Sequence, residues 1–230
     1  MREYQIAEIT RGESLPLPPL ADTHLMIIVD LILRAWGDIG MSHPSTLASG
    51  TEAEINALLE ARVNSLLSED EPWSQLIFCA ARGKESLSYD GTHLEKRPDI
   101  SLYLTRGNPA FPLTIECKII EISAGKSASL YCGNGLSRYL AGDYGWSAVD
   151  GLMIAYVRDG SSTAATLRPL LNETYGLPDD PYATTALPEP MDHPGTDAST
   201  SIHDRQFNYI DALGGHAPGC ISILHIWLVV

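Results

Sequence analysis

The sequence predicts an α/β protein with a mixed central sheet flanked by helices, and three observations support this. Residues 51–68 place apolar side chains along one face of a helix. Residues 134–141 predict a second helix. Four short apolar segments bounded by turn residues are typical of strands, at 75–80, 97–104, 112–122 and 151–157. Three successive strands, a helical crossover and a further strand predict a sheet with antiparallel and parallel neighbours.

The N-terminal part is predicted to lead into this core. Residues 1–20 end in LPLPPL, which favours an extended chain because proline interrupts a helix. Asp22 or Thr23 can cap a helix over about residues 24–36. The glycine-bounded segment 37–50 is predicted to be a loop.

A capping box begins the helix at 51–68. Thr51 stands three residues before Glu54, the spacing at which each side chain satisfies a backbone N–H group near the other. The apolar residues follow a period of 3.6, at Ile55, Leu58, Leu59, Val63, Leu66 and Leu67. This helix therefore has one face suited to packing on the sheet.

The C-terminal part is predicted to contain a loop and a last strand. Residues 177–200 hold five prolines and five acidic residues, a composition that favours a long, mobile surface loop. The segment ISILHIWLVV at 221–230 is almost entirely apolar and predicts a buried strand.

These elements predict a single domain over residues 1–230. Its core spans 51–158 and carries the αβββαβ order of elements. Residues 1–50 form a helical lead-in, and residues 159–230 an elaboration that includes the acidic loop.

The composition excludes some classes of protein. Fifteen basic against 29 acidic residues give a net charge of −14, which argues against binding nucleic acid through overall charge. A nucleic-acid role would need a local basic patch, metal ions or a basic partner. No apolar segment approaches the roughly 18–20 residues of a membrane span, and the segment MREYQIAEIT has no signal-peptide character. We therefore expect a cytoplasmic protein without a membrane partner.

The charged residues of two neighbouring strands are the main functional signal. Glu116 and Lys118 share one face of their strand, with Cys117 on the other, because side chains alternate. Asp99 lies near the start of the preceding strand, and a hairpin turn can bring it close to Glu116. Two adjacent carboxylates repel each other unless a cation lies between them. Mg²⁺ or Mn²⁺ suits such oxygen ligands, and the backbone carbonyl of Cys117 can supply a third.

Lys118 has a role beside such a metal. A bound cation polarises a phosphodiester and lowers the pKa of a water molecule. Lys118 would orient that water or stabilise charge in the transition state. The other interpretation of these residues is a same-face ion pair on a solvated sheet, with Asp99 as an acid at a strand entry.

Pro98-Asp99 followed about 17 residues later by Glu116-Cys117-Lys118 resembles the motif of the PD-(D/E)XK nuclease superfamily, the restriction-endonuclease-like proteins. The resemblance covers roughly half of the chain. It implies an αβββαβ core, a Mg²⁺- or Mn²⁺-dependent endonuclease activity, and DNA as the expected substrate. Asp99, Glu116 and Lys118 would be catalytic, and a restriction or anti-phage defence role would follow.

The resemblance implies two further site residues. Many such nucleases carry a glutamate on the first helix that approaches the metal. Glu52 falls in line with the apolar face of its helix, whereas Glu54 is explained by capping and Glu60 lies off the face. The second helix of the family often presents a basic residue to the substrate, and Arg138 is the candidate.

Two alternatives stay open. The chain could keep a nuclease-like fold and act as an interaction module within a larger complex, as its net charge, acidic loop and apolar C-terminus suggest. A protein partner or a homo-oligomer is also expected if an acidic nuclease needs help to hold DNA. The other alternative is metal-assisted hydrolysis of a different phosphoester or a nucleotide.

Overall fold

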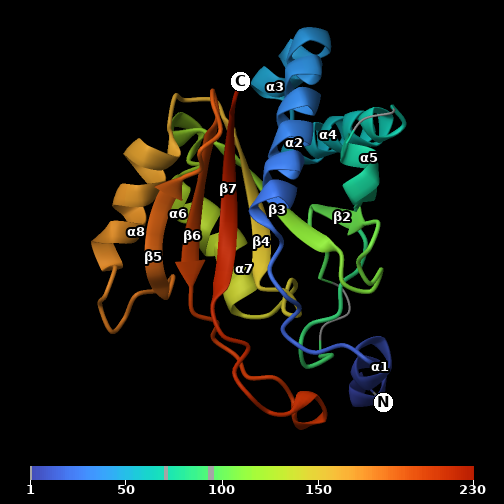
Figure 1. Ribbon diagram of the computed structural model, residues 1–230. Helices are drawn as coiled ribbons and strands as arrows, with labels where there is room; N and C mark the ends of the chain where they lie inside the picture. The colour runs from blue at the N-terminus through green and yellow to red at the C-terminus, as the bar shows by residue number, and fades with distance from the viewer. Residues whose placement is uncertain (1, 70–71, 93–95) are drawn as a thin grey trace.

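A computed structural model describes residues 2–69, 72–92 and 96–230, and it shows an α/β protein built on one open mixed sheet (Figure 1). In these residues the sheet has seven strands, in the order β1-β2-β3-β4-β7-β6-β5. The strands are β1 (Ile77–Arg82), β2 (Ile100–Leu104), β3 (Leu113–Ile120), β4 (Asp150–Val157), β5 (Thr184–Pro190), β6 (Asp197–His203) and β7 (Ile221–Val229).

The sheet is parallel in its centre and antiparallel on both sides. Strands β3, β4 and β7 are parallel neighbours. The pairs β1–β2 and β2–β3 are antiparallel, as are β7–β6 and β6–β5. The crossover between β3 and β4 follows the prediction, and β4 is buried along its whole length, as expected for a strand covered on both faces.

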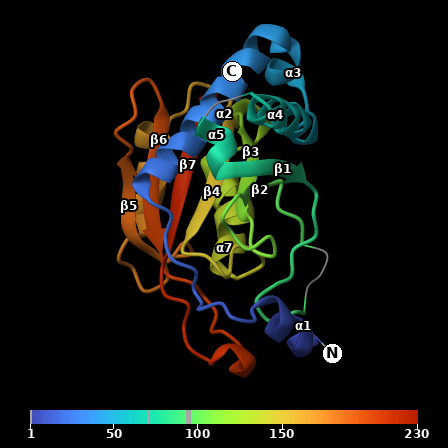
Figure 2. The same ribbon diagram turned by 45° about the vertical axis from the view of Figure 1, so that its right-hand side comes forward.

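Helices cover both faces of the sheet (Figure 2). The long helices α2 (Asp22–Ser42) and α4 (Glu52–Leu67) pack on one face, against Ile115, Cys117 and Ile119 of β3 among others. The opposite face is covered by α6 (Ala128–Tyr131), η2 (Cys132–Leu136), α7 (Ser137–Leu140) and α8 (Arg168–Thr174). The remaining elements are α1 (Arg2–Ile9), α3 (Pro44–Ser49), α5 (Pro72–Leu76), η1 (Ile122–Ala124), η3 (Thr163–Leu167) and η4 (Asp211–Leu213).

The predicted capping box of α4 is confirmed. Thr51 stands at the N-cap, and its backbone N–H and hydroxyl both donate to Oε2 of Glu54, at 2.7 and 2.8 Å. The Glu54 N–H donates back to the Thr51 hydroxyl. The hydrogen bonds also favour the charged form of Glu54 and lower its pKa.

Two predictions for the N-terminal part are wrong. Residues 2–9, expected to be extended, form α1, and the loop expected at 37–50 is helical. Helix α2 continues past Gly37 and Gly40 because its Trp36 and Ile39 are buried against the core, so packing outweighs the weak helix preference of glycine. Pro44 then begins α3, a position where proline is tolerated because its missing N–H would have no partner.

The prediction of a long loop at 177–200 is also wrong. Residues 184–190 and 197–203 are β5 and β6, which form an antiparallel pair at the edge of the sheet. Pro188 and Pro190 fit there because β5 is an edge strand, where one side needs no ladder hydrogen bonds. The register of the pair shifts between Ala186 and Glu189, next to Pro188. In the described ranges, no helix is long and apolar enough to cross a membrane.

Candidate functional site

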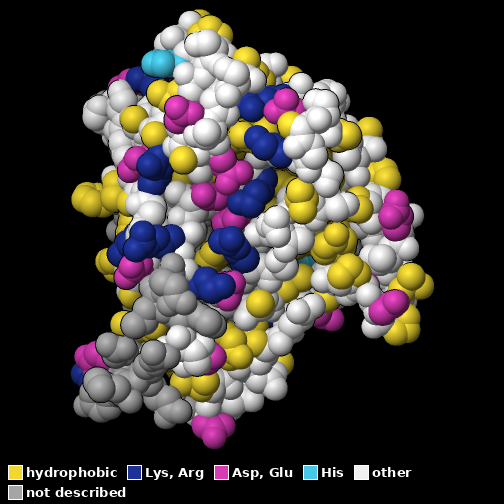
Figure 3. Space-filling model, turned by 180° about the vertical axis from the view of Figure 1, so that it is seen from behind, with side chains coloured by type: hydrophobic (Ala, Val, Ile, Leu, Met, Phe, Trp, Pro, Cys, Tyr) yellow, Lys and Arg dark blue, Asp and Glu magenta, His cyan; other side chains and the backbone are white. Residues whose placement is uncertain are grey.

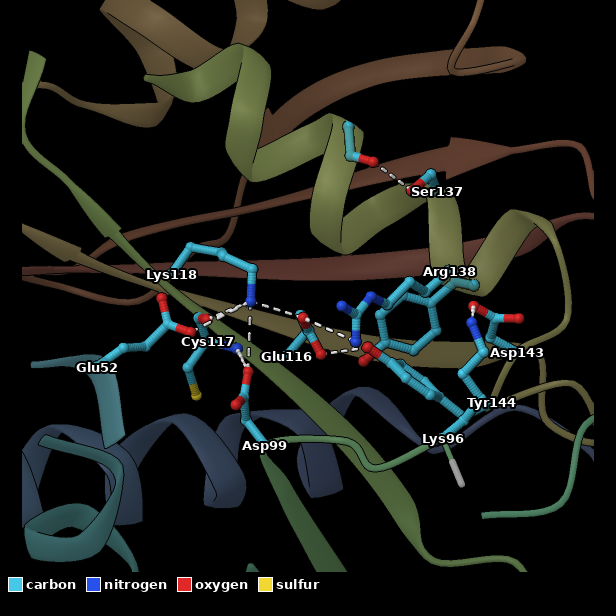
Figure 4. A network of polar contacts seen from close by, with 12 residues as sticks. Glu52, Lys96, Asp99, Glu116, Cys117, Lys118, Ser137, Arg138, Asp143 and Tyr144 are labelled. Carbon is cyan, nitrogen blue, oxygen red and sulfur yellow. Dashed lines mark hydrogen bonds and ion pairs between the residues drawn. The ribbon is translucent and has the colours of Figure 1, made fainter. Parts of the chain in front are cut away.

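The structure brings the predicted site residues together around the ammonium group of Lys118 (Figure 4). Its Nζ lies 2.6 Å from Oε1 of Glu116 and 2.8 Å from the carbonyl oxygen of Cys117. It also lies 3.4 Å from Oε1 of Glu52 and 3.5 Å from Oδ2 of Asp99. The four oxygen donors predicted for a metal ion therefore converge on one point, and a cation of this chain occupies that point.

An open edge of β3 explains why Glu52 and Asp99 reach the ammonium group of Lys118. Among the described residues, β2 pairs with β3 over Leu113–Ile115, and the later residues of β3 have backbone groups without a strand partner on that side. Asp99, immediately before β2, accepts the N–H of Cys117 at 2.8 Å. Glu52 enters from the first turn of α4, and the backbone N–H of Ile119 stabilises its carboxylate. The two carboxylates thus accept the N–H groups of Cys117 and Ile119, which a longer β2 would otherwise bond.

Glu116 is the most enclosed of the three acids, with only 1% of its side chain exposed. The Tyr144 hydroxyl donates to its Oε2, and Nη1 of Arg138 lies 3.8 Å from its Oε1. The crossover helix passes directly over it at Gly135, where an added Cβ would come within 3.2 Å of Cγ of Glu116. Glycine at this position therefore permits the close approach of helix and strand.

The protonation states follow from burial and from the neighbouring charges. Burial raises the pKa of Glu116, and the charge of Asp99 raises it further, against the opposing effect of Lys118. Burial also raises the pKa of Glu52, which Lys118 partly offsets. For Lys118, burial favours the neutral amine, but Glu116, Asp99 and Glu52 outweigh burial and raise its pKa. Lys118 is therefore an ammonium ion at neutral pH and cannot act as a general base.

Cys117 contributes its backbone and not its thiol to this site. Its side chain is fully buried on the opposite face of the sheet, among the apolar residues that pack under α2 and α4. Burial raises the pKa of the thiol well above its usual value. A thiol that stays protonated is a poor nucleophile, so the predicted role of Cys117 as a spacer agrees with its position.

The donor set fits a divalent cation in kind but not in its present arrangement. Three carboxylates and one carbonyl are the hard oxygen ligands that Mg²⁺ and Mn²⁺ prefer. In the described part of the chain, however, no group of three or more His, Cys, Asp or Glu side chains is arranged to hold a metal ion. The reason lies in the contacts of Lys118, whose ammonium group fills the space between the acids. A metal ion at this point requires Nζ of Lys118 to move aside.

Arg138, the candidate for contact with the substrate, lies beside Glu116, and Tyr144 is a neighbour of Glu116 that the sequence does not indicate. The guanidinium of Arg138 lies between Glu116 and solvent, with 38% of its side chain exposed. Burial opposes its charge, but Tyr144 and Glu116 outweigh that effect and raise its pKa. Tyr144 lies in the turn that follows α7, in the segment GDYGW, which has no periodic pattern. Its contact with Glu116 depends on how that turn folds over the sheet.

A second polar network lies inside the sheet, away from this site. The hydroxyl of Ser201 lies 2.7 Å from Nε2 of both His203 and His225. Nδ1 of His203 faces the carbonyl of Tyr182, and Nδ1 of His225 faces the hydroxyl of Tyr131, both at 2.8 Å. The two histidines and the serine have no exposed surface, so this network is structural.

Comparisons with protein-family models, with curated proteins and with solved structures find no significant match to this chain. The resemblance to the nuclease superfamily therefore depends on the residues and on the order of the elements alone.

Proposed function

We propose that the protein is a metal-dependent nuclease that hydrolyses phosphodiester bonds, with DNA as its substrate. The observation that carries the proposal is the convergence of Glu52, Asp99, Glu116 and the Cys117 carbonyl on one cation position. The order α4, β1, β2, β3, helical crossover and β4 supports a restriction-endonuclease-like core. A surface ion pair would not account for this enclosure, because a single carboxylate neutralises one lysine.

Each residue has a distinct part in this reaction. The oxygens of Glu52, Asp99, Glu116 and Cys117 would hold Mg²⁺ or Mn²⁺, which would polarise the phosphodiester and lower the pKa of a water molecule. Lys118, displaced from the centre, would orient that water and offset charge that develops on the phosphate. Because its pKa is raised, it acts in this role as an ammonium ion.

The distribution of charge gives a polyanion a place to bind. Residues 82–158 contain nine Lys or Arg against eight Asp or Glu, so the net charge of −14 arises outside this segment. On the face turned away from the viewer in Figure 1, Lys and Arg side chains gather around a small group of acids (Figure 3). A local basic surface of this kind attracts phosphate groups even on an acidic protein.

The test is cleavage of plasmid and of single-stranded DNA with Mg²⁺ or Mn²⁺. The wild-type chain is expected to cut, and Lys118→Ala is expected to lose the activity. Lys126→Ala is the matched control, since Lys126 pairs through its backbone with Glu121, after the end of β3. Folded wild-type protein that cuts neither DNA nor RNA, alone or with proteins purified from the same host, would rule out the proposal.

An interaction module is the second candidate, and one observation favours it. Phe78 is 74% exposed on β1, an edge strand of the sheet, and Met41 is 79% exposed at the end of α2. Exposed apolar residues on an edge strand are a common basis for association. Size-exclusion chromatography of Phe78→Ser beside the wild type tests this surface, and a manganese titration separates it from the nuclease proposal.

A further inference from the structure

A small cavity lies beside the site. Its volume is about 220 Å³, and it lies between β2, β3 and the turn that follows α7. Lys84 and Ala110, both exposed, line it together with buried residues, so the cavity reaches the surface. The buried lining includes three hydroxyl side chains, those of Ser101, Thr114 and Ser147.

Thr114 points to a ligand in this cavity. The residue is only 4% exposed, and its Oγ1 is buried without a hydrogen-bond partner among the described residues. Such orphaned groups are rare in native proteins, because burying a hydroxyl without a partner costs free energy. Gly145, which also lines the cavity, has no side chain to cover this hydroxyl: an added Cβ would lie 3.1 Å from it.

The cavity and the proposed catalytic site share one face of the sheet. Ser101 pairs directly with Thr114 across β2 and β3. Thr114 lies two residues before Glu116 on β3, so strand alternation points these two side chains to the same face, and Ser101 lies two residues after Asp99. Two residues along a strand span about 7 Å. A group in the cavity would therefore lie one step away from a phosphate at the site.

The residues that line the cavity suit a flat heterocyclic ring with polar edges. Phe111 and Trp146 line the cavity, in an edge-to-face contact with ring centroids 5.6 Å apart. Aromatic walls stack on heterocycles, and hydroxyl groups bond to their edges. The volume is below the roughly 300 Å³ at which pockets for drug-sized ligands begin, but it equals the liquid volume of about seven water molecules, enough for one base.

We propose that this cavity binds a single nucleobase, next to the scissile phosphate of the substrate. The Thr114 hydroxyl bonds to the edge of the base, and Lys84 at the rim faces the backbone phosphate. The proposal rests on the nuclease function for its substrate, but base binding can be measured without cleavage.

Calorimetric titration of the whole chain with the four deoxynucleosides, and with deoxyribose as the base-free probe, tests the cavity directly. At least one nucleoside is expected to bind, and deoxyribose is not. Thr114→Val, which keeps the shape and removes the hydroxyl, is expected to weaken binding about tenfold, as the loss of one buried hydrogen bond does. Ala110→Phe fills the mouth from an exposed position and is expected to abolish binding even if Thr114→Val does not fold.

Ser199→Ala is the matched control, because Ser199 on β6 also has a buried hydroxyl that finds no partner in the described part of the chain. It should bind nucleosides as the wild type does. The proposal is overturned if no nucleoside binds, or if both cavity variants bind as tightly as the wild type.

Mapping the cut positions in single-stranded DNA separates the two proposals. Wild type is expected to prefer the base that binds most tightly, and Ala110→Phe to cut without that preference. Nucleoside binding by a chain that cuts no nucleic acid would uphold the cavity and reject the nuclease. Cleavage whose base preference is unchanged in Ala110→Phe would reject the cavity and uphold the nuclease.

Discussion

Lys118 and Glu116 form a partly buried ion pair within a single strand, with Nζ of Lys118 2.6 Å from Oε1 of Glu116. Alternation along β3 makes the contact possible, since the residue between them points to the opposite face. Glu116 is 1% exposed and Lys118 18% exposed, so water screens the pair weakly. Glu52 and Asp99 add two more negative charges beside one ammonium ion. The cluster therefore has an excess of negative charge that a divalent cation would offset.

Replacing Lys118 by Met should destabilise the protein and create a dependence on divalent cations. Removing one partner of a buried pair leaves the other charge uncompensated, at a cost of about 3 kcal/mol. The measurement is the free energy of unfolding of Lys118→Met by urea, without metal and with Mn²⁺. Mn²⁺ should restore more stability to the variant than it adds to the wild type. Equal responses of the two proteins to Mn²⁺ would contradict a cation site at this point.

Asp99→Asn should separate the structural role of Asp99 from its catalytic role. The amide oxygen of asparagine can still accept the N–H of Cys117, so the unfolding free energy should change by less than about 1 kcal/mol. The loss of charge should lower metal-dependent cleavage about a thousandfold. Asp143→Asn, which removes the partner of Lys96, is the control and should keep activity. If Asp99→Asn cuts at the wild-type rate, Asp99 only completes the edge of β3.

Tyr144→Phe should raise the pKa of Glu116. The tyrosine hydroxyl donates to the Glu116 carboxylate and favours its charged form, so its loss should raise the pKa of Glu116 further. A ¹³C titration of the Glu116 carboxyl group measures this directly, and the acid limb of the pH–rate profile should move to higher pH. Tyr139→Phe is the control, because the Tyr139 hydroxyl donates to backbone carbonyls instead. An unshifted Glu116 titration in Tyr144→Phe would mean that Tyr144 only fills space.

The parts of the site that sequence predicts are those set by local geometry. Glu116 and Lys118 share a face in any strand, and the hairpin between β2 and β3 places Asp99 opposite Glu116. The resemblance implies a glutamate on α4, and the period of the helix selects Glu52. These predictions depend on residues that are near in sequence or joined by one short turn.

The parts that sequence misses depend on tertiary packing. Tyr144 reaches Glu116 through a turn whose path is set by how the crossover helix lies on the sheet. Pro188 and Pro190 predict a loop, yet they fit an edge strand, and which strand lies at the edge is a property of the whole sheet. Gly37 and Gly40 likewise suggest a loop, but α2 is stabilised by buried neighbours on the core side.

His203, Ser201 and His225 form a series of hydrogen bonds, and the carbonyl of Tyr182 at one end of the series fixes where the protons lie. Nδ1 of His203 faces a carbonyl, which only accepts, so Nδ1 carries the proton and Nε2 accepts from Ser201. Ser201 must then accept from Nε2–H of His225, whose Nδ1 accepts from Tyr131. This pattern gives each neutral imidazole ring one proton. Burial lowers the pKa of His203 to about 4 and that of His225 to about 3.

These lowered pKa values predict that acid destabilises the protein. Between about pH 6.5 and pH 4 the unfolded chain binds protons on both histidines and the folded chain does not, so the unfolding free energy falls as the pH falls. Each histidine contributes about 1.4 kcal/mol per pH unit in that window.

Urea unfolding of His203→Gln from pH 7 to pH 4.5 should show a slope of unfolding free energy against pH that is smaller by that amount. His24→Gln, on the exposed surface, should keep the wild-type slope. The raised pKa of Glu116 contributes a slope of unfolding free energy against pH with the opposite sign. This contribution is the same in the wild type and in both variants, so it cancels when their slopes are compared. A wild-type slope in His203→Gln would show that His203 is already charged in the folded protein.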